Sequence, residues 1–118
     1  FSNLLTKSSL SLLFITIEKH LSKFRYTIYE EDVSFNNGIV RVKINARRTN
    51  IKSQQLLGFY SVGRALQNSS SIFRKVQIII QYEMKEGQKV LLTAPVDLVL
   101  KLSQGNINSE QFFNSIEN

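Results

Sequence analysis

Apolar residues recur with the period of a helix near the start of the chain. Five of them fall at positions i, i+3, i+4, i+7 and i+11 and would share one helical face: Leu10, Leu13, Phe14, Ile17 and Leu21. Leu12 and Ile15 would widen this face, and Ser8 or Ser9 can cap the start by accepting a backbone hydrogen bond. The pattern predicts a helix that is more than half covered and that ends near Lys23.

The pattern then changes to the alternation typical of β-strands. Residues 24–29 alternate and are rich in aromatic and β-branched side chains, which predicts a first strand. Asn36-Asn37-Gly38 predicts a tight hairpin, because Asn and Gly tolerate the positive φ of a type I′ turn. The strand after this turn has an apolar face and a basic face. The apolar residues are Val40, Val42, Ile44 and Ala46, and the other face carries Arg41, Lys43, Asn45 and Arg47.

Helical spacing returns in residues 51–68, where Leu56, Tyr60 and Gly63 would share one face of a second helix. Leu66 and Gln67 are further candidates for this face, and Leu57, Phe59 and Val62 lie beside it. Gly58 and Gly63 each cost about 1 kcal/mol relative to alanine inside a helix. We expect close packing of the helix backbone on the sheet to compensate, and a kinked helix is the alternative.

Two further strands and two short helices complete the pattern. Residues 74–84 and 89–94 alternate as strands, joined by a polar turn. Pro95 ends the pairing because proline has no N–H to donate. A third helix is predicted over residues 96–102, and a last short helix follows Asn108.

The resulting order, αββαββαα, predicts an α+β two-layer sandwich. We expect a four-stranded, mostly antiparallel sheet with helices packed mainly on one face. A length of 118 residues corresponds to one domain over 1–118. Within it, residues 105–118 would form a C-terminal docking helix, and residues 1–7 need no fixed structure.

Composition narrows the functional classes. The chain has no cysteine and one histidine, which excludes disulfides, thiolate metal sites and cysteine nucleophiles. Its net charge of +6 favours an acidic partner, although the same charge also serves solubility. The longest apolar run, residues 10–17, is too short to cross a bilayer, so we expect no transmembrane segment here.

Candidate catalytic and metal-binding residues are few. His20 has no second histidine or cysteine with which to share a metal, and we interpret it as a surface or helix-end residue. The acidic triplet Glu30-Glu31-Asp32 lacks the spaced ligands of a calcium loop, so we interpret it as a solvated strand end. Phosphate-binding, dinucleotide and nucleophile-elbow motifs do not occur. We therefore expect a protein that is not an enzyme and that needs no cofactor.

Basic residues on the second strand form the first candidate surface. They continue into the second helix and could contact an anionic partner or nucleic acid: Arg41, Lys43, Arg47, Arg48 and Lys52. Lys75 and Lys89 would lie on the same side of the sheet or at its rim. An aromatic such as Tyr29 could add base stacking, but RNA-module signatures are missing. A solvated sheet face is the alternative interpretation.

The C-terminal helix is the second candidate surface. Asn108 and Gln111 have the spacing of a capping box. Phe112 and Phe113 are adjacent, so they cannot point in the same direction from one helix. One ring could dock on the domain while the other contacts a protein partner, together with Ile116; burial of both within the domain is the alternative.

The order helix–strand–strand–helix–strand, from Leu10 to about Glu83 with the hairpin Asn36-Asn-Gly38-Ile-Val-Arg-Val, resembles that of BON domains and of the ring-building domains of secretion systems. This resemblance implies a module that assembles by packing helices against neighbouring sheets. The fourth strand and the two terminal helices depart from that pattern.

Three functions remain open from the sequence. The first is a non-enzymatic protein-interaction or assembly module, self-associating or bound to a protein partner, with an envelope or secreted setting slightly favoured over the cytoplasm. The second is a nucleic-acid-binding domain that uses the basic face of the second strand. The third is a carrier of a small apolar ligand, with a cavity between the second helix and the sheet.

Overall fold

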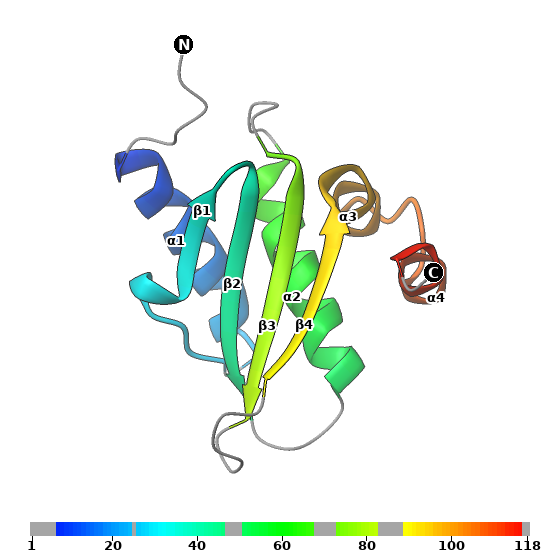
Figure 1. Cartoon of the computed structure of the whole chain (residues 1–118), viewed down its shortest axis with the longest axis horizontal. Coiled ribbons are helices and arrows are strands. Elements are labelled where there is room, and N and C mark those ends of the chain that lie inside the picture. The colour runs from blue at the N-terminus through cyan, green and yellow to red at the C-terminus, as the bar shows by residue number, and fades with distance from the viewer. Residues whose placement is uncertain (1–6, 25, 47–50, 68–72, 83–88, 117–118) are drawn as a thin grey trace.

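The computed structural model describes residues 7–24, 26–46, 51–67, 73–82 and 89–116. These residues form four helices, a short 3₁₀ helix and four strands (Figure 1). In chain order the elements are α1 (Lys7–Ser22), the 3₁₀ helix η1 (Glu30–Asp32), β1 (Val33–Asn36), β2 (Ile39–Ala46), α2 (Ile51–Leu66), β3 (Lys75–Tyr82), β4 (Lys89–Pro95), α3 (Val96–Ser103) and α4 (Ser109–Ile116).

The four strands form one sheet in the order β1-β2-β3-β4. The pairs β1–β2 and β3–β4 are antiparallel, whereas the central pair β2–β3 is parallel. The parallel pair arises because α2 carries the chain back to the starting end of β2 before β3 begins. The predicted α+β fold and element order are therefore confirmed, with a mixed sheet in which two of the three pairings are antiparallel.

Helices α1 and α2 lie behind the sheet in Figure 1, and the face toward the viewer carries none of the described helices. The core fills the space between these two layers. Its fully buried side chains come from alternate positions of β2 and β3 and from the inner faces of the helices: Val40, Val42, Ile44, Val76, Ile78, Ile80, Ile17, Leu21, Phe59, Val62, Val99 and Phe112. The alternation in β2 and β3 thus gives the sheet one apolar face and one open face.

The hairpin between β1 and β2 follows its sequence signature. Asn37 and Gly38 form the two-residue loop with φ values of 54° and 80°, the left-handed conformation that Asn and Gly adopt most readily. Arg74 holds this loop from the start of β3. Its backbone N–H donates to the Gly38 carbonyl at 2.8 Å, and its guanidinium Nη2 donates to the Asn37 carbonyl at 2.9 Å.

The first strand lies further along the chain than predicted. Residues 26–29 are outside the sheet, and β1 spans Val33–Asn36, directly before the turn. The two-residue loop pairs Asn36 with Ile39 and Val33 with Val42, so the partner of β2 must be the residues next to the loop. Because η1 interrupts the extended chain at Glu30–Asp32, the alternating residues before it cannot join the sheet.

Helix α1 is less covered than its sequence indicates. Leu13, Ile17 and Leu21 are buried as expected, but Leu12 and Ile15 are 65% and 54% exposed. The expectation that these two residues widen the buried face is wrong, because α1 touches the rest of the domain along one side only.

Helix α2 packs mainly through Leu66, a candidate for the predicted face, and through Phe59 and Val62 beside that face. Phe59, Val62 and Leu66 are buried, whereas Leu56 and Tyr60 are only half-buried. A Cβ atom at Gly58 would lie 3.1 Å from Ile78 and 3.2 Å from Ile44 side-chain atoms, which confirms close packing on the sheet at that position. Gly63 instead approaches α3, where a Cβ atom would lie 2.7 Å from the Ser103 Cβ.

Candidate binding surfaces

The open face of the sheet is built by the outward residues of all four strands. The strand register aligns them in rows: Ser34, Arg41, Gln77 and Thr93 form one row, and Lys43, Ile79 and Leu91 form the next. Asn45, Gln81 and Lys89 form the row beyond, and Lys75 lies at the opposite end beside Pro95. We call this set of residues the open sheet face.

Four basic side chains surround the centre of the open sheet face. Arg41 and Lys43 lie on β2, Lys75 begins β3 and Lys89 begins β4. Lys89 pairs with Gln81, which lies six positions after Lys75 on β3. Lys75 and Lys89 are therefore on the order of 20 Å apart along the strands. Positive charge is therefore spread over the whole face.

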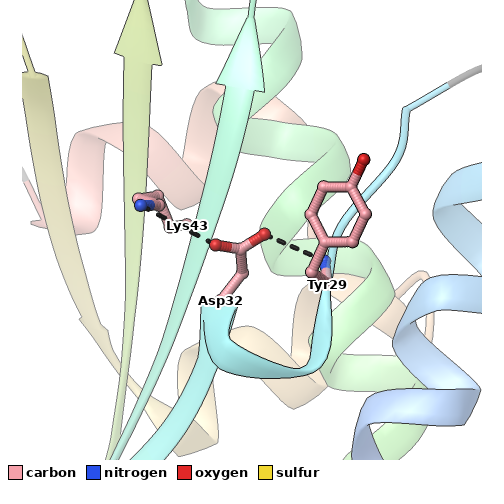
Figure 2. Close-up of polar contacts among 3 residues, drawn as sticks. All are labelled: Tyr29, Asp32 and Lys43. Carbon is pink, nitrogen blue, oxygen red and sulfur yellow. Dashed lines mark hydrogen bonds and ion pairs between the residues drawn. The ribbon is translucent and has the colours of Figure 1, made fainter.

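The one acidic side chain beside these cations in the described part of the chain is Asp32, at the β1 edge. Its Oδ1 lies 3.7 Å from Lys43 Nζ, and its Oδ2 accepts a hydrogen bond from the Tyr29 backbone N–H at 2.9 Å (Figure 2). Asp32 is only 8% exposed. It holds η1 closed and neutralises part of the charge of Lys43, and it is not the solvated strand end predicted from the sequence.

An apolar pair lies at the centre of the open sheet face. Ile79 and Leu91 are register partners on β3 and β4, and Leu91 is 54% exposed. Beside them, Gln77 Nε2 donates a hydrogen bond to Thr93 Oγ1 at 3.0 Å. The face thus has apolar side chains in the middle, Lys43 directly beside them on β2, and amides, a hydroxyl and the other cations in the neighbouring rows.

The structure separates the basic residues grouped by sequence. Arg41 and Lys43 lie on the open sheet face as expected, while Arg47 and Arg48 lie outside the described residues. Lys52 belongs to α2 and lies with its Nζ 4.8 Å from the centre of the Phe113 ring. The contribution of Leu91 was missed, because its place beside Ile79 follows from the β3–β4 register and not from any local motif.

The two adjacent phenylalanines of α4 are both buried. Phe112 has no exposed surface and its ring lies 5.0 Å from that of Phe59, while Phe113 is 7% exposed and contacts Phe112 edge-on at 5.5 Å. The expectation that one ring is left for a partner is therefore wrong. Ile116 is half-buried. Both rings are accommodated because Phe112 packs against Phe59 while Phe113 packs against Phe112 and lies below the Lys52 ammonium.

The second candidate surface is a groove on the helical side of the molecule. It is an apolar groove of about 610 Å³ that follows α2, and none of the strands lines it. Its lining residues are Phe24, Tyr26, Ser53, Leu56, Leu57, Tyr60, Leu102 and Ser109. This groove lies on the outer side of α2 and not between α2 and the sheet, where the sequence suggested a cavity; we call it the α2 groove.

His20 borders the α2 groove. Its ring lies 5.7 Å from Phe24 and 5.4 Å from Tyr60, and its Nδ1 forms a 2.7 Å hydrogen bond with Ser61 Oγ. Burial lowers the pKa of His20, and the positive charges of Lys23 and Arg64 lower it further. A serine beside a histidine is the arrangement of a nucleophile and its base, but Ser61 has no exposed surface. Its hydroxyl cannot reach a substrate, so this pair joins two helices.

Two other kinds of site have no counterpart in the described part of the chain. No three His, Cys, Asp or Glu side chains there are grouped so that they could hold a metal ion. None of the described helices combines the length and the apolar character needed to cross a membrane.

Comparison with known proteins adds no relative: no protein-family model, no curated protein and no solved structure matches this chain. The two surfaces above are therefore the basis for functional inference.

Proposed function

We propose that this protein is a non-enzymatic interaction module that binds an acidic protein partner through its open sheet face. The observation that carries the proposal is the pair of half-buried Ile79 and exposed Leu91, with Arg41 and Lys43 beside it on β2 and Lys75 and Lys89 toward the two ends of the face. Protein interfaces combine an apolar centre with a polar rim. Four cations around that centre select a partner whose own rim is acidic, because opposite charges across an interface steer association and fix its register.

A protein partner suits this face better than single-stranded nucleic acid. Proteins that bind single strands stack bases on aromatic rings within a basic groove. The described outward residues of the four strands include no aromatic side chain, and Tyr29 precedes η1, outside the sheet, where its backbone bonds to Asp32 (Figure 2). An aliphatic centre contributes little to stacking, whereas burying Leu91 and Ile79 against apolar side chains is favourable by roughly 25 cal/mol per Å².

The test compares two labelled probes by fluorescence anisotropy at low salt. One is a peptide of alternating Glu and Leu, and the other is a single-stranded oligothymidylate of similar length. We expect the peptide to bind more tightly. The variant Arg41→Glu/Lys75→Glu should weaken peptide binding about tenfold or more, because each reversal replaces attraction by repulsion. Leu91→Ser should weaken the peptide and leave the weaker oligonucleotide binding unchanged.

Lys19→Glu/Lys101→Glu provides the matched control, since it lowers the net charge by the same amount as the double variant and both lysines are exposed on helices, α1 and α3. It changes the net charge of the protein without touching the open sheet face. Equal loss of binding in this control and in the double variant would show that binding depends on the net charge of the protein and not on the open sheet face. Tighter binding of oligothymidylate, with a steep dependence on salt, would assign the face to nucleic acid instead.

A further inference from the structure

The α2 groove has the size and lining of a small-molecule site. Its volume of about 610 Å³ falls within the range of ligand pockets, which run from roughly 300 to 1,000 Å³. Leu56, Leu57 and Leu102 supply aliphatic surface, and the ring of Phe24, 53% exposed, forms part of a wall. An apolar side chain with that exposure gains by being covered.

The length of the groove limits what can occupy it. Ser53 and Tyr60 line it from the same helix and are seven residues apart, so the groove follows α2 for about 10 Å. A typical partner helix of eleven or twelve residues is about 17 Å long and would extend beyond the lining residues. A flexible chain of moderate length fits this distance better.

One end of the groove is positively charged. Lys23 directly precedes Phe24, and Arg64 follows Tyr60 by one helical turn. Both cations lie close enough to His20 to lower its pKa, and His20 itself contacts the rings of Phe24 and Tyr60. Neither Lys23 nor Arg64 forms an ion pair with another residue in the described part of the chain. Two cations that pair with no residue in the described ranges therefore flank the same end of an apolar groove.

We propose that the α2 groove binds an anionic amphiphile with a single medium-length acyl chain, its chain lying along α2 and its carboxylate between Lys23 and Arg64. The apolar lining accounts for the chain, and the flanking cations account for the charged head. Ser53 and Ser109 add two polar side chains to the lining.

This site is independent of the proposed function, because it lies on the helical layer and the open sheet face lies on the other side of the sheet (Figure 1). A negative result for the groove ligand therefore does not contradict the proposed function of the open sheet face, and the reverse also holds. The two proposals also use different cations, so each supplies the control variant for the other.

The test is isothermal titration calorimetry with three probes, all below their aggregation concentration. Decanoate has both the chain and the charge, decanol has the chain alone, and butyrate has the charge with little chain. We expect saturable binding of one decanoate per protein, binding of decanol about tenfold weaker, and no measurable binding of butyrate. Lys23→Gln/Arg64→Gln should lower the affinity for decanoate to that for decanol and leave the affinity for decanol unchanged.

Two variants identify the location. Ser109→Trp fills the groove with a large ring and leaves the Asn108–Gln111 cap in place, so it should weaken decanoate and decanol alike. Lys75→Gln, on the open sheet face, should change neither affinity. Thermal unfolding of each variant establishes that it remains folded.

Several outcomes would overturn this proposal. They are equal affinities for decanoate and decanol, no effect of the Lys23→Gln/Arg64→Gln change, or undiminished binding in Ser109→Trp. Sedimentation that shows a dimer which Ser109→Trp converts to a monomer would likewise reject it, because a second copy would then occupy the groove.

Discussion

His20 joins α1 to α2 through its hydrogen bond to the buried Ser61, and its surroundings oppose protonation. Desolvation lowers its pKa, and Lys23 and Arg64 add repulsion. In the unfolded chain this histidine titrates at its ordinary, higher pKa. At a pH between the two values the unfolded state binds more protons, so the free energy of unfolding rises with pH.

Stability should therefore fall as the pH is lowered from about 7.5 to about 5.5, across the histidine range. His20 is the only histidine, so His20→Gln should remove this slope while the effect of acid on carboxylates at lower pH remains. Urea unfolding at a series of pH values measures how the free energy of unfolding depends on pH. An unchanged slope in His20→Gln would contradict the assignment.

Gly63 and Gly58 offer a matched pair of residues on one helix. A Cβ atom at position 63 would meet the Val99 carbonyl oxygen at 2.9 Å and Ser103 at 2.7 Å, whereas one at position 58 would meet only side-chain atoms of isoleucines at 3.1 Å or more. Backbone cannot move aside as side chains can. Gly63→Ala should lose about 1–3 kcal/mol of stability through overpacking, although alanine improves helix propensity.

Gly58→Ala should lose less than about 1 kcal/mol, since the gain in propensity is of similar size to the mild crowding. Denaturant unfolding of both variants provides the comparison. Equal losses at the two positions would show that the separation between α2 and α3 is not set by Gly63.

Helix α4 is fixed by its N-terminal cap and by one ring. Asn108 Oδ1 accepts from the Gln111 N–H at 2.8 Å, and Gln111 Oε1 accepts from the Asn108 N–H at 2.9 Å, so the predicted capping box is present. Phe112 then enters the core against Phe59. A helix of eight residues has little stability of its own, so docking and capping hold it together.

Asn108→Ala should lower stability by about 1 kcal/mol by removing the cap, and Phe112→Ala by about 3–5 kcal/mol by opening a cavity. Asn108→Ser keeps an oxygen at the cap and should stay near the wild type. Thermal unfolding ranks the three. A loss from Asn108→Ser as large as that from Asn108→Ala would contradict the role of the side-chain oxygen.

The elements also show what sequence patterns can and cannot determine. The inner faces of β2 and β3, the Asn37–Gly38 turn and the α4 cap follow from local rules, because spacing and backbone preference act over a few residues. The first strand was misplaced because alternation at residues 24–29 is a local signal, while the partner of β2 is set by the hairpin register.

The candidate sites divide in the same way. Arg41 and Lys43 were predicted from alternation alone. The Ile79–Leu91 pair depends on the pairing of β3 with β4. The α2 groove forms where four parts of the chain meet: the segment that follows α1, helix α2, helix α3 and the start of α4. No periodicity along the chain encodes such a meeting of distant segments. These two features depend on the tertiary packing and could not be predicted from local patterns.

At the scale of the whole molecule, two layers present two different surfaces. The sheet offers a broad basic face with an apolar centre, and the helices offer a short apolar groove with cations at one end. A net charge of +6 acts over both. Because exposed charges are screened by salt, partner binding at the open sheet face should weaken as ionic strength rises.

The measurement that tests the central claim most directly is a ¹⁵N–¹H correlation spectrum of the protein titrated with the Glu/Leu peptide. The account predicts that the largest shifts fall on outward residues of β2, β3 and β4, including Gln77, Ile79 and Leu91, and that α1 and α2 stay unchanged. Shifts concentrated around Tyr60 and Leu57 in the α2 groove, or no shifts at a saturating peptide concentration, would contradict it.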